Sequence, residues 1–341
     1  RGHGDTDYIV YADERYTYAE TDAHIRALAG RLRDEHGVAP GDRVAIAMRN
    51  YPERVIGYWA IVSIGAACVG MNAWWTTEEM EYGLADSRPK VLLADTERIE
   101  RVLPVLDGLR AEHQLDLITV RYDGDLPADA VRWEDVIDPS SAPAELPAVE
   151  IDPDDDACIF YTSGTTGFPK GAQLTHRGSV HNLINIIFMT SVGGLAAAKA
   201  APESVPAPAV GPDGQPAQNV FMAPTPLFHV TANNRLLHPA TLAGSRIVFT
   251  YKWDAGRALE LIERERVTNF SGVPTMSREM LMHPDWERRD TSSLAGMGGG
   301  GAPLQPDLVE KIDKSLSGGA PSTGYGLTET HGIVTANSGS L

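Results

Sequence analysis

Cysteine is scarce in this chain. Cys68 and Cys158 are the only two among 341 residues, and each lies in an apolar run. Two cysteines exclude a scaffold held by several disulfides, and no Cys or His spacing predicts a metal cluster. We therefore expect reduced thiols and a cytoplasmic location, and the start of the sequence does not resemble a signal peptide.

Positive charge is also scarce. Lys and Arg number 29 against 46 Asp and Glu, which gives a formal net charge of −17. Nucleic acid and anionic membrane both attract basic surfaces, so neither is expected as a main partner. Only six of the 29 basic residues are lysines. Lys170, which lies in a loop of Gly and Thr, is therefore unlike an ordinary surface lysine.

One long stretch lacks charge altogether. Residues 55–75 are 21 uncharged positions, long enough to span a membrane. Glycines at positions 57, 65 and 70 interrupt the stretch, and its apolar residues have helical spacing only at its start. We predict a buried helix over 53–64 and a short buried strand over 66–70. No transmembrane span is expected, whereas peripheral membrane contact and a homodimer are left open.

Helical and strand patterns alternate along the rest of the chain. With 43% hydrophobic and 22% charged residues, the composition is that of a globular protein. Thr17 and Glu20 form a capping box that opens a helix, and strands are predicted over 42–49, 91–95 and 117–122. Such alternation predicts an α/β fold with mostly parallel sheets flanked by helices.

Two segments rich in proline interrupt this alternation. Residues 138–156 combine Pro, Ser and acidic side chains, so we predict a first subdomain over 1–150 and a second over 151–341. Within the second, a helix over 175–189 is expected to end in a flexible insertion over 191–218. Strands are then predicted over 219–223, 246–250 and 269–272, with helices after Asp254 and over 304–316.

The loop at 161–177 (YTSGTTGFPKGAQLTHR) concentrates glycine, hydroxyl side chains and one lysine between two apolar stretches. Glycine lets a backbone approach a ligand closely, and hydroxyls, backbone N–H groups and lysine can surround phosphate oxygens. This composition favours a polyphosphate-binding loop over a plain linker. It is not a Walker loop, because Pro169 precedes Lys170 and Gly171 follows it.

The segment YTSGTTGFPKG at 161–171 resembles the phosphate-loop signature of the adenylate-forming superfamily, which includes acyl-CoA synthetases, luciferases and peptide-synthetase adenylation domains. PLFHV at 226–230, GGGGAPL at 298–304 and GYGLTET at 324–330 match further signatures in the same order. The resemblance covers essentially the whole chain. It implies the two-lobed large N-terminal domain of an enzyme that uses ATP to turn a carboxylate into an acyl-adenylate, which a thiol, commonly that of coenzyme A, then attacks.

The resemblance implies a nucleotide site made of two segments. The phosphate loop would hold the β- and γ-phosphates, and later the leaving pyrophosphate, through Thr162, Ser163, Gly164, Thr165, Thr166, Gly167 and Lys170. The adenine side would consist of Gly300, Gly301, Ala302, Gly324, Tyr325, Gly326, Leu327 and Thr328, with Tyr325 stacking on the base. Four consecutive glycines cost backbone entropy, so we expect a ligand to approach closely at 298–301.

Three residues are predicted to be catalytic, namely Lys170, His229 and Glu329. Glu329 matches the family's Mg²⁺-associated carboxylate, with Thr162 as a second metal contact, since a cation between phosphates needs few protein ligands. Taken alone, Glu329 would be interpreted as a residue in the first turn of a helix, and its place beside Tyr325 and Thr328 in the motif favours the metal role. His229 matches a histidine that would bond the carboxylate or α-phosphate, or act as a gate; the alternative is a hydrogen-bonded core histidine.

The acyl group, by the same resemblance, would contact His229, Asn233, Gly272, Val273 and Gly300. Residues 231–234 (TANN) depart from relatives that have Gly or a bulky aromatic there, which puts an aromatic gate in doubt. The apolar stretch at 183–189 suits an apolar tunnel. The favoured function is therefore a medium- or long-chain fatty acid–CoA ligase that uses ATP, Mg²⁺ and coenzyme A.

Three alternatives are retained. They are a CoA ligase for an aryl or other small acid, an acyl-AMP ligase that loads a carrier protein, and a degenerate nucleotide-binding module. The family's ribose-binding Asp motif, hinge and small C-terminal domain with its catalytic lysine follow the GYGLTE segment, whereas this sequence ends at Leu341. With that small domain absent, these 341 residues alone are expected to adenylate poorly.

Overall fold

The computed structural model describes residues 2–163, 167–200, 217–316 and 320–338. The chain folds into two compact units. Unit 1 comprises Arg1–Thr6, Tyr16–Ser179 and Leu227–His229, and unit 2 comprises Asp7–Arg15, Val180–Pro226 and Val230–Leu341. Each unit is built on a mostly parallel sheet with helices on it, which confirms the predicted fold class.

Unit 1 contains a seven-stranded sheet in the order β7-β6-β5-β3-β4-β8-β9. All described pairs are parallel except β8 with β9, which is antiparallel. The strands are β3 (Arg43–Ala47), β4 (Ala67–Gly70), β5 (Val91–Asp95), β6 (Asp116–Val120), β7 (Ala130–Arg132), β8 (Asp156–Thr162) and β9 (Lys170–Thr175).

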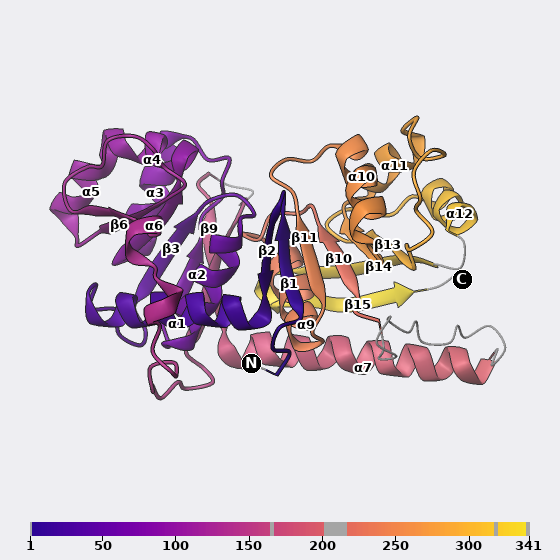
Figure 1. Ribbon diagram of the computed structural model, residues 1–341, viewed down its shortest axis with the longest axis horizontal. Helices are drawn as coiled ribbons and strands as arrows, with labels where there is room; N and C mark the ends of the chain where they lie inside the picture. Colours follow the sequence, from indigo (N-terminus) through magenta and orange to yellow (C-terminus); the bar gives the residue numbers. More distant parts are fainter. Residues whose placement is uncertain (1, 164–166, 201–216, 317–319, 339–341) are drawn as a thin grey trace. The chain divides into compact units, whose positions relative to one another are not determined.

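Helices cover both faces of this sheet (Figure 1). One face, with Leu92 and Ala94, packs against Met80, Ile99 and Leu106 of three successive helices. On the other face α2 packs so closely that a Cβ at Gly57 would lie 3.1 Å from Ile46. The helices are α1 (Tyr18–Asp34), α2 (Pro52–Ser63), α3 (Thr77–Ser87), α4 (Thr96–Val102), α5 (Leu106–Glu112) and α6 (Trp133–Val136).

The local predictions for unit 1 are confirmed in detail. Thr17 caps α1 and Glu20 completes the reciprocal capping box, as the spacing of the two residues predicts. The uncharged stretch 55–75 does form a helix and then a strand, α2 and β4, and every residue of β4 is buried. Its apolar composition therefore reflects burial in the core of unit 1.

Unit 2 contains an eight-stranded sheet in the order β15-β14-β13-β12-β10-β11-β1-β2. Strands β1 and β10 to β14 run parallel, and β15 is antiparallel to β14. The strands are β1 (Asp7–Tyr11), β2 (Glu14–Thr17), β10 (Val220–Ala223), β11 (Arg246–Phe249), β12 (Asn269–Gly272), β13 (Gly296–Gly299), β14 (Ala320–Leu327) and β15 (Gly332–Ser338).

Helices again lie on both sides of the unit 2 sheet, with α10, α11 and α12 on one side and α7 and α9 on the other (Figure 1). Val248, Phe270 and Met297 of the sheet pack against Leu259 and Leu308. The helices are α7 (His176–Ala200), α8 (Val230–Ala232), the π-helical turn η4 (Asn233–Leu237), α9 (His238–Leu242), α10 (Ala255–Glu265), α11 (Pro274–Met282), α12 (Pro306–Ser315) and the 3-10 turn η5 (Thr328–Thr330).

The predicted boundary at residue 150 needs correction. Strands β8 and β9 follow the proline-rich connector, but they extend the unit 1 sheet. There β8 runs parallel to β4, and Cys158 lies opposite Cys68 in the register. In the other direction, β1 lies near the start of the chain yet pairs with β11 in unit 2. A connector in the sequence marks a loop, whereas strand pairing decides which sheet each segment joins.

Helix α7 also differs from its prediction. It continues 11 residues beyond the expected end at 189, so residues 191–200 of the expected insertion are helical; residues 201–216 lie outside the described part. Four of the five residues at 196–200 are alanine and none is glycine or proline, which favours the helix. Residues 176–196 have a mean hydropathy of 1.3 with only 11% of the segment buried, so by length and composition alone α7 could span a membrane.

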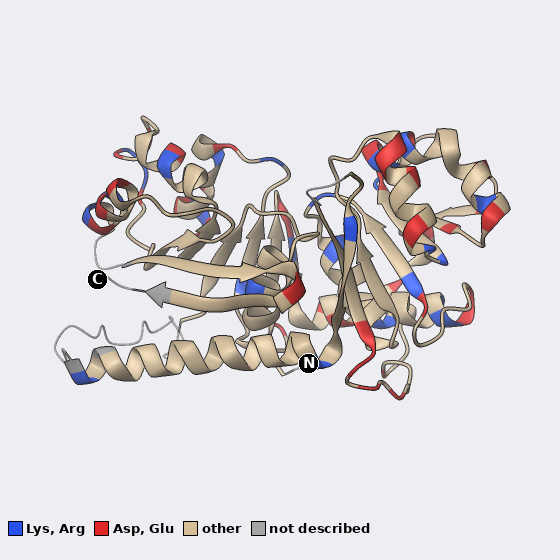
Figure 2. Cartoon of the chain, turned by 180° about the vertical axis from the view of Figure 1, so that it is seen from behind, with Lys and Arg blue, Asp and Glu red and all other residues tan. Residues whose placement is uncertain are grey.

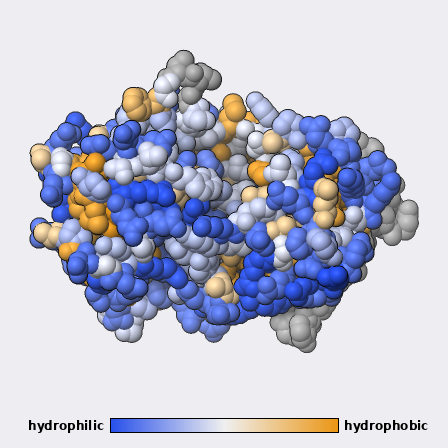
Figure 3. Space-filling model, turned by 90° about the horizontal axis from the view of Figure 1, so that it is seen from above, coloured by the Kyte–Doolittle hydropathy of each residue, from blue (hydrophilic) through white to orange (hydrophobic). Residues whose placement is uncertain are grey.

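The exposed side of α7 is apolar. Ile184 is 53% exposed and Phe188 65%, and few charged residues lie along the helix (Figure 2). By contrast, the surface seen in Figure 3, over α3–α5 and α10–α12, is mostly hydrophilic with small apolar patches. The stretch 183–189 therefore presents large apolar side chains outward. This result removes one argument from the sequence for an apolar inner tunnel.

Candidate nucleotide and acyl site

The phosphate loop of unit 1 connects two antiparallel strands. Thr162 at the end of β8 pairs with Lys170 at the start of β9, and the Thr162 hydroxyl donates to the Lys170 carbonyl oxygen at 3.4 Å. The side chains of Ser163 and Lys170 are exposed. Gly167 has φ of +90° and open space around its Cα, so glycine is needed there for the turn. Gly164, Thr165 and Thr166 lie outside the described residues.

An aromatic contact that the sequence did not reveal fixes the second half of this loop. The exposed ring of Phe168 stacks on Tyr82 of α3, with ring centroids 4.6 Å apart and an interplanar angle of 18°. The Tyr82 hydroxyl also donates to the carbonyl oxygen of Pro169 at 3.1 Å. Tyr82 therefore positions the backbone immediately before Lys170, from a site 88 residues earlier in the chain.

His229 belongs to a cluster of aromatic and cationic groups in unit 1. Its ring lies 4.6 Å from that of Phe228, which contacts Trp74 at 5.2 Å, edge to face. Surrounding protein atoms lower the pKa of His229, and the Arg54 guanidinium lowers it further, although the side chain retains exposed surface. A neutral imidazole results, which can accept a hydrogen bond as well as donate one.

Arg54 contacts this cluster through the ring of Phe228. It is 2% exposed, donates to the Ile46 carbonyl oxygen at 3.2 Å and places its guanidinium 5.9 Å from the centre of the Phe228 ring. Burial lowers its pKa to about 10, so it stays charged at neutral pH. Its cation–π contact with Phe228 helps to fix the residue that precedes His229.

In unit 2, several predicted site residues follow the carboxyl ends of parallel strands. Gly272 ends β12 and Gly299 ends β13, and the loops after them begin with Val273 and Gly300. Ligands commonly bind beyond the carboxyl ends of the strands of an open α/β sheet. Topology thus brings together segments that lie 27 residues apart in the sequence.

The structure explains the glycines at 298–301 in different ways. A Cβ on Gly299 would overlap the Gly272 carbonyl oxygen, and one on Gly298 would overlap the backbone of Ser322. These two glycines are explained by the neighbouring strands, which corrects the expectation that a ligand accounts for all four. Gly301 has φ of +86°, and a Cβ added there would meet only the Val273 side chain, at 3.7 Å, so Gly301 faces open space.

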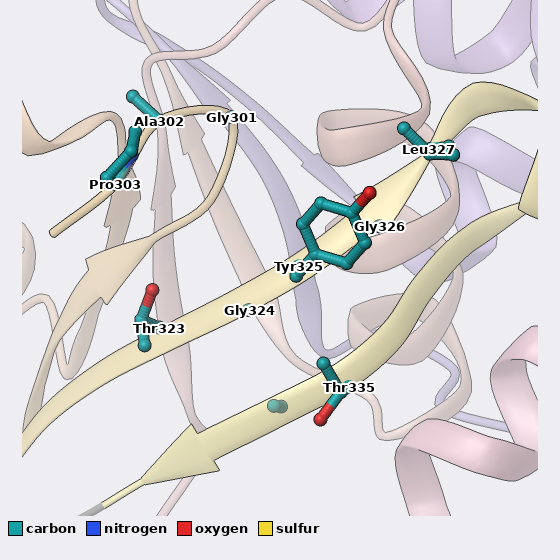
Figure 4. A pocket seen from close by; sticks show the side chains of 10 residues that line it. Gly301, Ala302, Pro303, Thr323, Gly324, Tyr325, Gly326, Leu327 and Thr335 are labelled. Carbon is teal, nitrogen blue, oxygen red and sulfur yellow. The ribbon is translucent and has the colours of Figure 1, made fainter.

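Beyond these glycines lies a cavity of about 600 Å³ (Figure 4). Six predicted nucleotide residues line it: Gly301, Ala302, Gly324, Tyr325, Gly326 and Leu327. The Tyr325 ring stands on β14, beside the loop that carries Ala302, and is 61% exposed. An exposed aromatic face at the rim of a cavity suits stacking on a planar base. Gly300 and Thr328 lie next to the lining residues in sequence.

Four lining residues were not predicted, namely Pro303, Thr323, Thr335 and Ala336. Pro303 and Thr323 directly flank predicted segments. Thr335 and Ala336 lie on β15, which follows the last signature segment and pairs with β14. Pairing of Tyr325 with Thr335 depends on the antiparallel register with its bulge at Tyr325/Gly326, for which no local pattern gave a signal.

Glu329 lies in the 3-10 turn η5 directly after β14, and its side chain is exposed. The hydroxyl of Thr330 holds this turn by accepting from the Leu327 amide at 3.1 Å. Thr162 belongs to unit 1 and Glu329 to unit 2. Within the described ranges no group of three His, Cys, Asp or Glu residues could hold a metal ion, so a protein-only metal site is not formed there.

The segment after His229 forms the turn η4, which is rich in polar side chains. Asn233 is 2% exposed, donates to the Asn234 side-chain oxygen at 3.0 Å and lies 3.4 Å from Nε2 of His238. Burial lowers the pKa of His238 to about 4. Asn233 thus has partners inside the turn, and its contact with an acyl group stays a prediction.

The comparisons with known proteins agree with this geometry. The sequence model of the AMP-binding enzyme family matches residues 1–340. The chain is 33% identical over 314 residues to a feruloyl-CoA synthase from Amycolatopsis sp, covering 92% of this chain and 54% of that protein. It is 30% identical over 323 residues to 4-coumarate–CoA ligase CCL1 from Humulus lupulus, covering 94% and 54%.

A solved structure gives the same result. The inhibitor-bound N-terminal domain of FACL13 from Mycobacterium tuberculosis is similar with 28% identity and a TM-score of 0.73, over 97% of this chain and 74% of that one. The chain belongs to the AMP-binding enzyme family, and its fold is that of the N-terminal domain of adenylate-forming enzymes. It spans about half the length of the curated relatives it matches.

Proposed function

We propose that this chain, within its complete protein, activates a carboxylic acid for transfer to coenzyme A. The observation that carries the proposal is the cavity of unit 2, because six residues predicted to contact the nucleotide line it together. Membership of the AMP-binding enzyme family supports the same function. The related feruloyl-CoA synthase and 4-coumarate–CoA ligase are both named as enzymes that join an acid to CoA.

The proposed reaction has two steps. An oxygen of the acid's carboxylate attacks the α-phosphorus of ATP, the bond to the bridging oxygen breaks, and pyrophosphate leaves with the electron pair. The CoA thiol then loses its proton and displaces AMP from the acyl carbon, which forms the thioester. Negative charge moves onto the leaving pyrophosphate, and the exposed Lys170 beside the hydroxyls of Thr162 and Ser163 is suited to stabilise it. Tyr325 would hold the adenine.

Mg²⁺ is the ion that such a reaction commonly uses, and the donors on this chain fit it. Glu329 offers an exposed carboxylate and Thr162 a hydroxyl, both hard oxygen ligands. Mg²⁺ usually takes one or two protein carboxylates and completes its shell with phosphate oxygens and water, so Glu329 alone would be a sufficient protein carboxylate. When bound, the ion would neutralise phosphate charge.

We propose a small or aromatic acid as the substrate, in place of the long-chain fatty acid that the sequence favoured. The apolar residues of the 183–189 stretch are largely exposed. The segment after His229 contains the polar residues Asn233, Asn234 and Arg235, of which the two asparagines are buried and Arg235 is half-buried. The names of the related sequences, which refer to ferulate and 4-coumarate, support the same choice.

ATP–pyrophosphate exchange with the complete protein tests the function. The panel contains hydroxycinnamic and benzoic acids, short dicarboxylic and monocarboxylic acids, and C6–C18 fatty acids. We expect exchange with a small or aromatic acid, and a Lys170→Ala variant should lower it about 100- to 1,000-fold, as for loss of one stabilising donor. Lys252→Ala, which removes another exposed lysine, is the matched control.

Each failure has its own meaning. Exchange with fatty acids alone would contradict the substrate choice. An unchanged rate in the Lys170 variant would instead revive the hypothesis of a degenerate nucleotide-binding module. If acyl-adenylate forms but CoA does not accept the acyl group, the acceptor is a carrier protein. The poor activity expected of these 341 residues alone stays a prediction, which the same assay checks.

A further inference from the structure

Helix α3 contacts the phosphate loop at two points that lie one helical turn apart. Tyr82 stacks on Phe168 and donates from its hydroxyl to the Pro169 carbonyl oxygen at 3.1 Å. Four residues later, Asp86 accepts from the Tyr161 hydroxyl at 2.6 Å. Residues four apart on a helix lie on the same side of it. One side of α3 therefore contacts both the chain that enters the loop and the chain that leaves it.

Both contacts lie directly beside residues proposed to bind phosphate. Tyr161 immediately precedes Thr162, and Pro169 immediately precedes Lys170. Thr162 and Lys170 lie opposite each other in the antiparallel register of β8 and β9. The two contacts with α3 thus restrain the backbone next to the hydroxyl on one strand and next to the lysine on the other.

The two sides differ in how deeply they are buried. Tyr161 is 6% exposed, packs with Trp75 in the core of unit 1, and also donates to the Gly83 carbonyl oxygen at 3.3 Å. Phe168, by contrast, is 64% exposed, and Tyr82 is half-buried. The hydroxyl side is therefore fixed by the core, whereas on the lysine side Tyr82 supplies both a ring contact and a hydrogen bond at the surface.

The hydrogen bond of Tyr82 restrains the group that carries the lysine. The Pro169 carbonyl group and the Lys170 N–H group belong to one peptide bond, which is planar. A bond to that carbonyl oxygen restrains the whole peptide group, and with it the direction in which the Lys170 side chain leaves the backbone. The ammonium group ends a flexible four-carbon chain. A donor that stabilises developing charge has to be in place beforehand, so a fixed starting point for this chain matters.

We propose that Tyr82 is a positioning residue for the phosphates of the nucleotide and acts through Lys170. The inference rests on the proposed function. In this role Tyr82 fixes the peptide group before Lys170, while Asp86 fixes the other side of the loop through Tyr161. Loss of the Tyr82 hydroxyl should therefore weaken binding of ATP and pyrophosphate and leave binding of the acid as it is.

Two measurements on the complete protein test the proposal. Isothermal titration calorimetry with pyrophosphate and MgCl₂ gives the Kd for pyrophosphate, and ATP–pyrophosphate exchange gives separate KM values for pyrophosphate and for the acid. Tyr82→Phe keeps the stacked ring and removes one hydrogen bond, so the Kd and KM for pyrophosphate should rise about 3- to 10-fold. Tyr82→Ala removes the ring contact as well, and the rise should be about 10- to 100-fold. The KM for the acid should stay the same in both variants.

A matched control and a double-mutant cycle separate positioning from a general structural role. Tyr122 also donates from its hydroxyl to a backbone carbonyl oxygen of unit 1, that of Asp125 at 3.3 Å. Tyr122→Phe should therefore leave both constants unchanged. In a Lys170→Ala background, Tyr82→Phe should cause no further loss of pyrophosphate affinity, because the group that it positions is gone. Thermal transitions establish that each variant is folded.

Two results would overturn the inference while leaving the proposed function intact. One is an unchanged affinity for pyrophosphate in Tyr82→Phe, since the proposal depends on the hydroxyl. The other is an equal loss with and without Lys170, or an equal rise in the KM for the acid, either of which would mean a structural role. If Tyr82→Ala does not fold, Tyr82→Phe and the cycle decide. Absence of exchange with every acid, with the protein folded, would overturn the proposed function and the inference with it.

Discussion

Arg98 and Arg235 lie in two regions that differ in how the positive charge of the guanidinium is balanced. Arg98 is fully buried in unit 1, where it bonds both oxygens of Asp95 and also reaches Glu97 and the Ala73 carbonyl oxygen at 3.1 Å. Arg235 in unit 2 has one described partner, the Ser271 hydroxyl. Carboxylates of the protein balance the charge of Arg98, and we call this the closed region. No described carboxylate bonds to Arg235, and we call the part of unit 2 around Arg235 the open region.

The difference separates stability from function. Around Arg98, carboxylates and a carbonyl oxygen satisfy the guanidinium, so this region can contribute to folding by itself. Arg235 has one described hydrogen bond, to a hydroxyl, and the ring of Tyr325 is 61% exposed and can contact a bound molecule. Changes in the closed region should therefore affect the free energy of unfolding, and changes in the open region should affect binding and selectivity.

The closed region should give the largest effect on stability. Arg98→Ala leaves Asp95, which is 1% exposed, buried without its main partner. We expect a loss of about 3–5 kcal/mol in the free energy of unfolding, measured by urea denaturation of the complete protein. Arg33→Ala, which breaks an exposed pair with Asp34, is the control and should leave the midpoint unchanged. Equal effects of both variants would remove the distinction drawn above.

Low pH should destabilise the folded state through His238, a buried base three residues after Arg235. The pKa of His238 is 6.5 in the unfolded chain and about 4 in the folded state, where burial lowers it. Between these values only the unfolded chain takes up the proton, so the free energy of unfolding falls by about 3 kcal/mol as pH drops from 6.5 to 4.

The contribution of His238 can be isolated by substitution. In His238→Gln, the fall in stability between pH 6.5 and pH 4 should be smaller by that amount, measured by denaturation at several pH values. The exposed His181 serves as a control, and His181→Gln is measured over the same pH range. An identical pH dependence in the His238 variant would mean that the ring takes up a proton in the folded state.

The smallest effect is expected at the rim of the cavity. Tyr325→Ala should weaken ATP binding about 10- to 100-fold, since stacking on a base contributes about 1–3 kcal/mol. Isothermal titration calorimetry measures the change. Tyr325→Phe keeps the ring and should bind nearly as well as the unmodified protein. Weak binding by the Phe variant would show that the hydroxyl, rather than the aromatic face, is the important group.

Local features of the fold were predictable because they depend on neighbouring residues. Strand β5 occupies the predicted residues 91–95, and Asp254 caps α10 as expected, with its side chain accepting from the Arg257 amide at 2.7 Å. Six of the residues that line the cavity were likewise named from short segments. Capping, alternation and signature motifs all act over a few positions, so a sequence displays them directly.

The sequence by itself determined where most elements begin and named six of the residues that line the cavity of unit 2. Only the tertiary structure decided that β8 and β9 join the first sheet, that Tyr82 stacks on Phe168, and that Arg235 donates to the Ser271 hydroxyl. These contacts join positions far apart in the chain. Which distant positions meet depends on strand order and helix packing, and only the folded chain establishes both.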